Sequence, residues 1–116
     1  MQEPALVVTR AYDLTLWLFQ KVESLPRSHR VLLGDRTVKS GLEILPVLLV
    51  RAAYLPSHSP RKAELLDRAN LETNALRYLL RISKDLRLIS LDSYTFASQR
   101  IEEIGRMTAG WRKSLS

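Results

Sequence analysis

Apolar residues recur at spacings of three, four or seven residues along most of this chain, which is the period of an α-helix. Proline and glycine fall mostly between the periodic stretches, and no run alternates apolar and polar residues as a half-buried β-strand does. This punctuation predicts four helices, at about 5–24, 28–54, 60–88 and 93–114. Long helices joined by short connections are typical of an up-down-up-down antiparallel four-helix bundle, here all-α and a single domain over residues 1–116.

Prolines and serines set the expected helix ends. Pro4 and Pro60 occupy first helical turns, where the missing N–H costs nothing, and Ser28 and Ser59 are suitable N-caps. Pro46 falls inside the second helix, and because the apolar period continues on both sides we expect a kink there. The residues expected to form the core are Val7, Ala11, Leu14, Leu18, Leu25, Val38, Leu42, Leu45, Leu49, Ala52, Leu66, Ala69, Thr73, Leu76, Leu80, Ser83, Ala97, Ile101, Ile104, Thr108, Trp111 and Leu115.

The second and third helices carry more apolar residues than these stripes. On the third helix the buried stripe is expected to be widened by Leu65, Leu79, Ile82 and Leu86. The apolar residues outside the stripes are Leu32, Leu33, Ile44, Val47, Leu48, Val50, Leu71, Tyr78 and Ile89. So wide an apolar arc on a small bundle indicates either a surface for self-association or a broader core with partly exposed leucines.

Composition excludes several classes of function. The chain has no cysteine, so it has no disulfide framework, thiolate metal site or cysteine nucleophile. It also has no apolar run of about 18 residues, so we expect no membrane span. The first residues lack a basic region and are interrupted by Arg10 and Asp13, so we expect no secretory signal and a cytoplasmic location.

The polar residues form no catalytic or metal-binding pattern. Glu102 and Glu103 are adjacent and so point about 100° apart on a helix, with no histidine three or four residues away. His29 and His58 lie in basic, polar surroundings, and the four isolated glycines form no phosphate-cradling loop. We therefore expect a binding protein that is not an enzyme and holds no metal or cofactor.

The chain is basic, with 18 lysines and arginines against 12 acidic residues, and this charge favours an anionic partner. Thirteen of the 18 are arginines, which suit bidentate contact with phosphate. Arg77, Arg81 and Lys84 fall within about 60° of one another on the third helix, and Asn70 and Asn74 continue this strip. The helix dipole explains a cation at Lys84, near the helix end, but not at Arg77, three turns away.

A second basic cluster lies at the corner between the first two helices. Arg27, Arg30, Arg36 and Lys39 surround the start of the second helix, where the dipole disfavours cations. A phosphate-binding role would explain them, since helix N-terminal amides and arginines then act together. A solvated ion pair between Asp35 and Lys39 is the alternative for part of the cluster.

Four blocks of sequence resemble, in order and spacing, the accessory variability determinant family of diversity-generating retroelements. These blocks are "LPRSHRVLLGDR", "RAAY", "ANLETNALRYLLRISKDLRLIS" and "IEEIGRMTAGWRKS", within about Leu14 to Ser114. That family is allied to the four-helix-bundle proteins encoded in bacterial ribosomal RNA intervening sequences. The resemblance implies a homopentameric barrel of basic four-helix bundles without an active site of its own. It also implies binding to the retroelement reverse transcriptase and to nucleic acid, in support of mutagenic copying of a template RNA into cDNA.

The arginines of the family's "LR-x-x-LR" segment fall on Arg77 and Arg81. We therefore predict a homopentamer whose surface for reverse transcriptase, RNA and possibly DNA is formed by Arg77, Arg81, Lys84, Arg27, Arg30 and Arg36. Two other functions remain open. One is a bundle of the ribosomal RNA intervening-sequence type that binds RNA without a polymerase partner, and the other is a structural oligomer whose charge only keeps it soluble.

Overall fold

The computed structural model describes residues 4–30, 34, 36 and 45–115, and these ranges contain helices and no strand. The helices are α1 (Pro4–Glu23), α2 (Arg27–His29), α4 (Leu45–Ala53), α5 (Pro60–Asp85) and α6 (Leu91–Ser114). They form a rod with extents of 46 × 23 × 19 Å.

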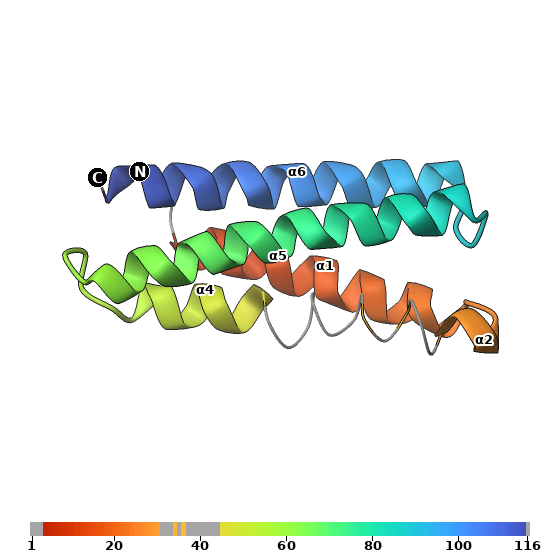
Figure 1. Ribbon diagram of the computed structural model, residues 1–116, viewed down its shortest axis with the longest axis horizontal. Coiled ribbons are helices and arrows are strands. Elements are labelled where there is room, and N and C mark those ends of the chain that lie inside the picture. The colour runs from red at the N-terminus through yellow and green to blue at the C-terminus, as the bar shows by residue number, and fades with distance from the viewer. Residues whose placement is uncertain (1–3, 31–33, 35, 37–44, 116) are drawn as a thin grey trace.

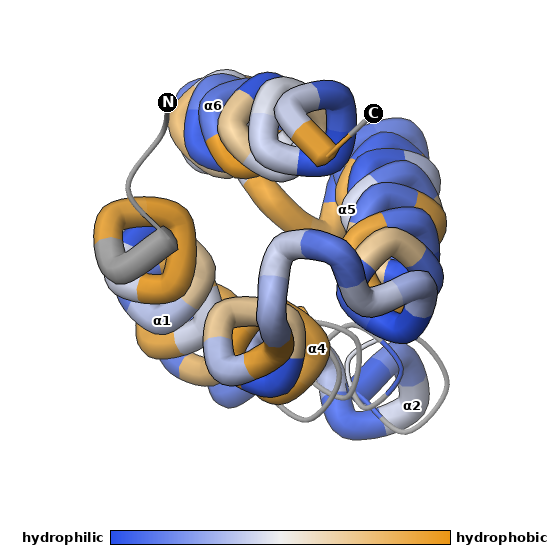
Figure 2. The backbone as a smooth tube through the Cα atoms, turned by 90° about the vertical axis from the view of Figure 1, so that its left-hand side faces the viewer, coloured by the Kyte–Doolittle hydropathy of each residue, from blue (hydrophilic) through white to orange (hydrophobic). Residues whose placement is uncertain are grey.

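The long helices run alternately up and down the rod. In Figure 1, α1 and α5 run from the end that carries both termini towards the other end, and α4 and α6 return. α1 packs against α4 and α6, and α5 packs against the same two helices, so the four close a ring around one core (Figure 2). The predicted all-α antiparallel bundle is thus confirmed for the described helices.

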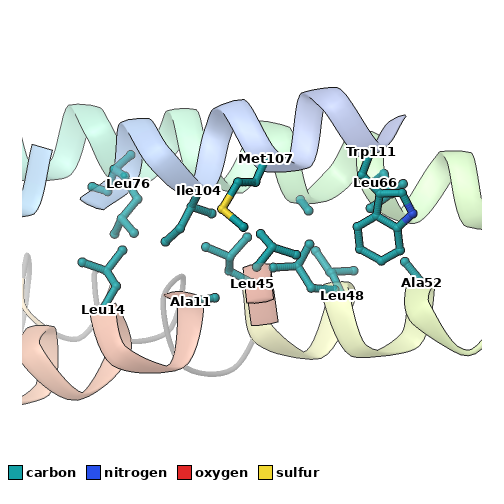
Figure 3. Packing of buried hydrophobic residues seen from close by; sticks show 14 of the residues in the cluster. Ala11, Leu14, Leu45, Leu48, Ala52, Leu66, Leu76, Ile104, Met107 and Trp111 are labelled. Atoms are coloured by element: carbon teal, nitrogen blue, oxygen red, sulfur yellow. The ribbon is translucent and has the colours of Figure 1, made fainter. Parts of the chain in front are cut away.

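The core lies on the predicted stripes. Figure 3 shows the buried residues of the four helices pointing into one shared interior. The cluster consists of Val7, Ala11, Leu14, Leu18, Leu45, Leu48, Leu49, Ala52, Leu65, Leu66, Ala69, Leu76, Leu80, Ala97, Ile101, Ile104, Met107 and Trp111. Thr73, Ser83, Thr108 and Leu25 are buried as predicted, and Leu115 packs partly buried against the cluster. The predicted Val38 and Leu42 lie outside the described residues.

The edges of the stripes differ from the prediction in both directions. Ile82 and Leu86 are 44% and 55% exposed rather than buried, while Leu65 is buried as expected. Ile82 lies about 160° around the helix from the buried Leu80, so it points away from the interior. Leu48, predicted outside the stripe, is buried because α4 packs between two neighbours and so buries a wider arc.

The apolar residues predicted to be surplus divide between surface and core. Val47, Val50, Leu71 and Tyr78 are exposed, whereas Ile89 packs partly buried against the core. The remaining members of that set, Leu32, Leu33 and Ile44, lie outside the described residues.

The start of α5 lies where the sequence predicted it, and the start of α6 does not. Ser59 is the N-cap of α5 and Pro60 follows at its start, as predicted, but no side-chain capping bond forms. α6 begins at Leu91, two residues before the predicted start, because the Ser90 hydroxyl oxygen accepts a hydrogen bond from the Ser93 N–H at 3.0 Å.

The prediction for the second helix can be compared at its two ends only. Ser28 lies inside α2 rather than at its N-cap, because the extended Pro26 precedes the helix instead. Pro46 lies in the first described turn of α4, and the expected kink involves residues outside the described ranges.

Arg87 ends α5 in a backbone conformation that favours glycine. Its φ is 60°, in the left-handed region. The Leu88 N–H donates to the Ser83 carbonyl at 2.8 Å and the Arg87 N–H donates to that of Lys84 at 2.9 Å, which are the two bonds of a Schellman motif. The helix therefore stops three residues before the predicted end.

We expect Arg87→Gly to raise the free energy of unfolding by about 1 kcal/mol, because glycine adopts the left-handed conformation without a Cβ clash. Urea unfolding followed by far-UV circular dichroism will measure the change. Arg87→Ala is the control, since it removes the charge but keeps the Cβ. A glycine variant no more stable than the alanine variant would contradict the strain at this position.

Candidate nucleic-acid interface

A groove of about 570 Å³ lies between α5 and α6, on the face that carries the predicted arginine strip. α5 contributes side chains one turn apart, and α6 contributes three at a spacing of four residues, so each helix presents one row to the groove. The lining residues are Asn74, Arg77, Tyr78, Arg81, Tyr94, Ser98 and Glu102.

Arg77 crosses from α5 to α6 and is held there by three features. Its Nη2 lies 3.2 Å from Glu102 Oε2, and its Nη1 donates a hydrogen bond to Asn74 Oδ1. Gly105 leaves room for the guanidinium, since a Cβ there would stand 2.9 Å from Arg77 Nη2. This ion pair explains a cation so far from the helix end, although an exposed pair of this kind stabilises the fold by at most about 1 kcal/mol.

Of the cations predicted to form the strip on α5, Arg81 is the one whose charge remains available to bind a ligand. It is exposed, and within the described part of the chain it makes no ion pair. Lys84 is more constrained, because its Nζ lies 4.7 Å from the centre of the Tyr94 ring and 3.3 Å from Asp85 Oδ1. Of the three strip cations, Arg81 is therefore the one best placed to contact a ligand.

Other basic residues hold helices together. Arg10 Nε lies 2.9 Å from Glu103 Oε1, which joins α1 to α6, and Arg112 Nε lies 2.9 Å from Asp67 Oδ1, which joins α6 to α5. The adjacent glutamates 102 and 103 thus serve different neighbours, as their 100° separation on the helix requires. Lys62 is buried, donates from Nζ to the Leu55 carbonyl at 3.1 Å and stacks over the Trp111 ring.

The three arginines of the corner cluster, Arg27, Arg30 and Arg36, are exposed. α2, which contains Arg27, lies at the same end of the bundle as the connection from α5 to α6 (Figure 1). The chain passes close to α1 at Gly34, where an added Cβ would stand 2.7 Å from Val22 Cγ1. This close approach explains why position 34, within the sequence block LPRSHRVLLGDR, is a glycine, which has no Cβ. Lys39 and Asp35 lie outside the described residues, so the suggested ion pair between them stays a prediction.

The comparison with known families decides what kind of bundle this is. A family model described as bAvd-like matches residues 5–115, which takes in α1, α2, α4, α5 and α6. The chain belongs to the bAvd-like family. This confirms the resemblance to accessory variability determinants, and it suggests an accessory protein of a diversity-generating retroelement. A search of curated proteins finds no match.

Within the described ranges of this bAvd-like chain, no three histidine, aspartate or glutamate side chains come together as a metal site would require. None of the helices described is both long enough and apolar enough to cross a membrane.

Sequence reasoning missed the aromatic side chains of this bAvd-like groove. Tyr78 was assigned to the surplus apolar residues, and Tyr94 was not singled out. The signal was present, because Tyr94, Ser98 and Glu102 share one face of α6, and Tyr78 lies one turn before Arg81 on α5. Finding the groove also required the rotation of the two helices about their axes, which spacing within each helix does not give.

Proposed function

We propose that this bAvd-like protein is a non-catalytic accessory protein of a diversity-generating retroelement. In this role it binds the reverse transcriptase and the template RNA in the cytoplasm through its basic surface, and supports mutagenic cDNA synthesis. The family assignment supports the accessory role. The observation that carries the nucleic-acid part is Arg81, an exposed arginine without an ion pair among the described residues, beside the restrained Arg77.

Phosphate is a fitting ligand for this surface. A guanidinium binds phosphate oxygens bidentately, and a net charge of +6 attracts a polyanion over a long range. The exposed corner arginines Arg27, Arg30 and Arg36 add positive charge outside the groove. A bound nucleic acid that spans both clusters would release several counterions, so binding will weaken as salt rises.

Self-association is the other part of the proposal, and the assembly that we propose is a homopentamer. Two rows of exposed apolar side chains support self-association, and the family resemblance supplies the number of five protomers. Tyr12, Leu16 and Phe19 lie along α1 at helical spacing, and Val47 and Val50 lie one turn apart on the neighbouring α4. Figure 2 shows hydrophobic residues concentrated on α1 and α4 and hydrophilic ones on α5. A second protomer would cover the rows and leave the α5–α6 groove open.

The nucleic-acid part is tested by Arg81→Gln. We expect about tenfold weaker binding of a single-stranded RNA at low salt, because one charge-assisted phosphate contact is lost. The slope of log K against log salt should also fall by about 0.7. Fluorescence anisotropy over a series of salt concentrations will measure both quantities.

Arg68→Gln is the matched control, because it removes the same charge from an exposed position of the same helix, outside the groove. It should leave the affinity nearly unchanged. Equal losses in the two variants would mean that only net charge attracts the RNA, and an unaltered Arg81 variant would remove this residue from the interface.

A further inference from the structure

We propose that the α5–α6 groove binds one unpaired nucleotide of a single-stranded nucleic acid, with its base against Tyr78 and its phosphate on Arg81. The inference rests on the nucleic-acid binding proposed above and adds the form of nucleic acid recognised. The groove volume of about 570 Å³ lies within the range of about 300–1,000 Å³ that is usual for small-ligand sites.

Tyr78 supplies the surface on which a base can stack. It is 65% exposed, so its ring contributes little to the core, yet it lines the groove beside charged and amide groups. Tyr94 forms the opposite wall from α6 and is half-buried, with the Lys84 ammonium 4.7 Å from its ring centre. The tyrosine with an open ring is therefore Tyr78. Stacking on an aromatic ring strengthens binding by about 5- to 150-fold per base and tolerates every base.

The charges of the groove set the direction in which a nucleotide would lie. Glu102 places a carboxylate at the Arg77 end, which repels a phosphate, whereas Arg81 lies one turn from Tyr78 without an ion pair in the described ranges. The phosphate is therefore directed to Arg81. The base edge is directed to the amide of Asn74 and the hydroxyl of Ser98, which can donate and accept hydrogen bonds.

This arrangement favours a single strand over a duplex. In a duplex the bases are stacked on one another, and their faces cannot reach Tyr78 unless a base is extruded. Arg81 alone would bind the phosphates of either form. The aromatic ring next to the arginine is thus the feature that distinguishes the two forms. An acidic protein segment would use the arginine but gain nothing from the open ring.

The test compares a single-stranded RNA 20-mer with a duplex of the same length, using the full-length protein and fluorescence anisotropy. We expect Tyr78→Ala to weaken single-strand binding about tenfold without changing the salt slope, because stacking releases no counterions. Duplex binding should be unaltered, and Tyr78→Phe should keep the single-strand affinity. Tyr54→Ala, at an 87% exposed tyrosine outside the groove, is the control and should match the parent protein.

Other outcomes would separate failure of the nucleotide site from failure of the proposed function. Binding that depends on Arg81 but not on Tyr78, or that falls equally for both forms, would overturn the nucleotide site and leave the proposed function standing. A parent protein that binds neither RNA would overturn the nucleic-acid part of the function together with the site. Binding of a polyglutamate peptide that competes with the single strand and depends equally on Tyr78 would assign the groove to an acidic protein and overturn the inference.

Discussion

Leu76→Ala will lower the free energy of unfolding by about 2–5 kcal/mol, a large part of the total of about 5–15 kcal/mol expected for a domain. Leu76 is fully buried and points from α5 into the interior of the bundle, where Leu14 and Ile104 point from α1 and α6 (Figure 3). Removing its side chain takes away buried apolar contacts and leaves a cavity that rigid helices fill only in part. Urea unfolding at one fixed protein concentration will measure the change, because self-association would make stability depend on concentration.

Leu91→Ala is the matched control for this variant. The same atoms are removed, but Leu91 is 68% exposed at the start of α6. Its loss should change stability by less than about 0.5 kcal/mol. If the two variants unfold at the same urea concentration, the assigned core position of Leu76 is wrong.

Leu16→Glu will dissociate the oligomer that we propose. Leu16 is 48% exposed in the middle of the apolar row on α1, so a glutamate there leaves the isolated bundle folded. In an assembly that covers this row, the carboxylate would be buried without a partner. That burial costs about 3–5 kcal/mol per interface, which weakens association by about 10²- to 10³-fold or more. Multi-angle light scattering at micromolar concentration should then show the 13.3 kDa monomer.

Gln99→Glu introduces the same negative charge at an exposed position of α6, outside both apolar rows and outside the groove. It should leave the assembly intact. A parent protein that is already monomeric, or a Leu16 variant that stays assembled, would show that this row is not the surface of self-association.

The repeat of apolar residues was enough to predict the helices and most of the core. Leu14, Leu66 and Ile104 were assigned to the interior from spacing alone and are buried, because the helical period is a local property of each segment. At the edges of the buried arcs, the prediction was wrong for Ile82, which is exposed, and it left open whether Leu48, which is buried, lies in the core or on the surface. How wide an arc is buried depends on which neighbours a helix packs against, and a single segment does not contain that information.

The two ends of α5 also differ in how far the sequence predicted them. Pro60 at the start of α5 was predictable, since its fixed φ suits a first helical turn. The end of α5 at Arg87 was not, because an arginine in the left-handed region contradicts the local preference for glycine there.

The sequence by itself determined that the chain is basic, helical and apolar along one face of each helix, and its four blocks indicated the family. Only the tertiary structure decided what each cation does. Arg77 is paired with Glu102, 25 residues away, and Arg81 is left open beside Tyr78. A pairing across two helices depends on their relative rotation and axial register, which packing of the whole core sets. The spacing within each helix carries the period of its side chains but not that register, so the groove became visible only when α5 and α6 were placed together.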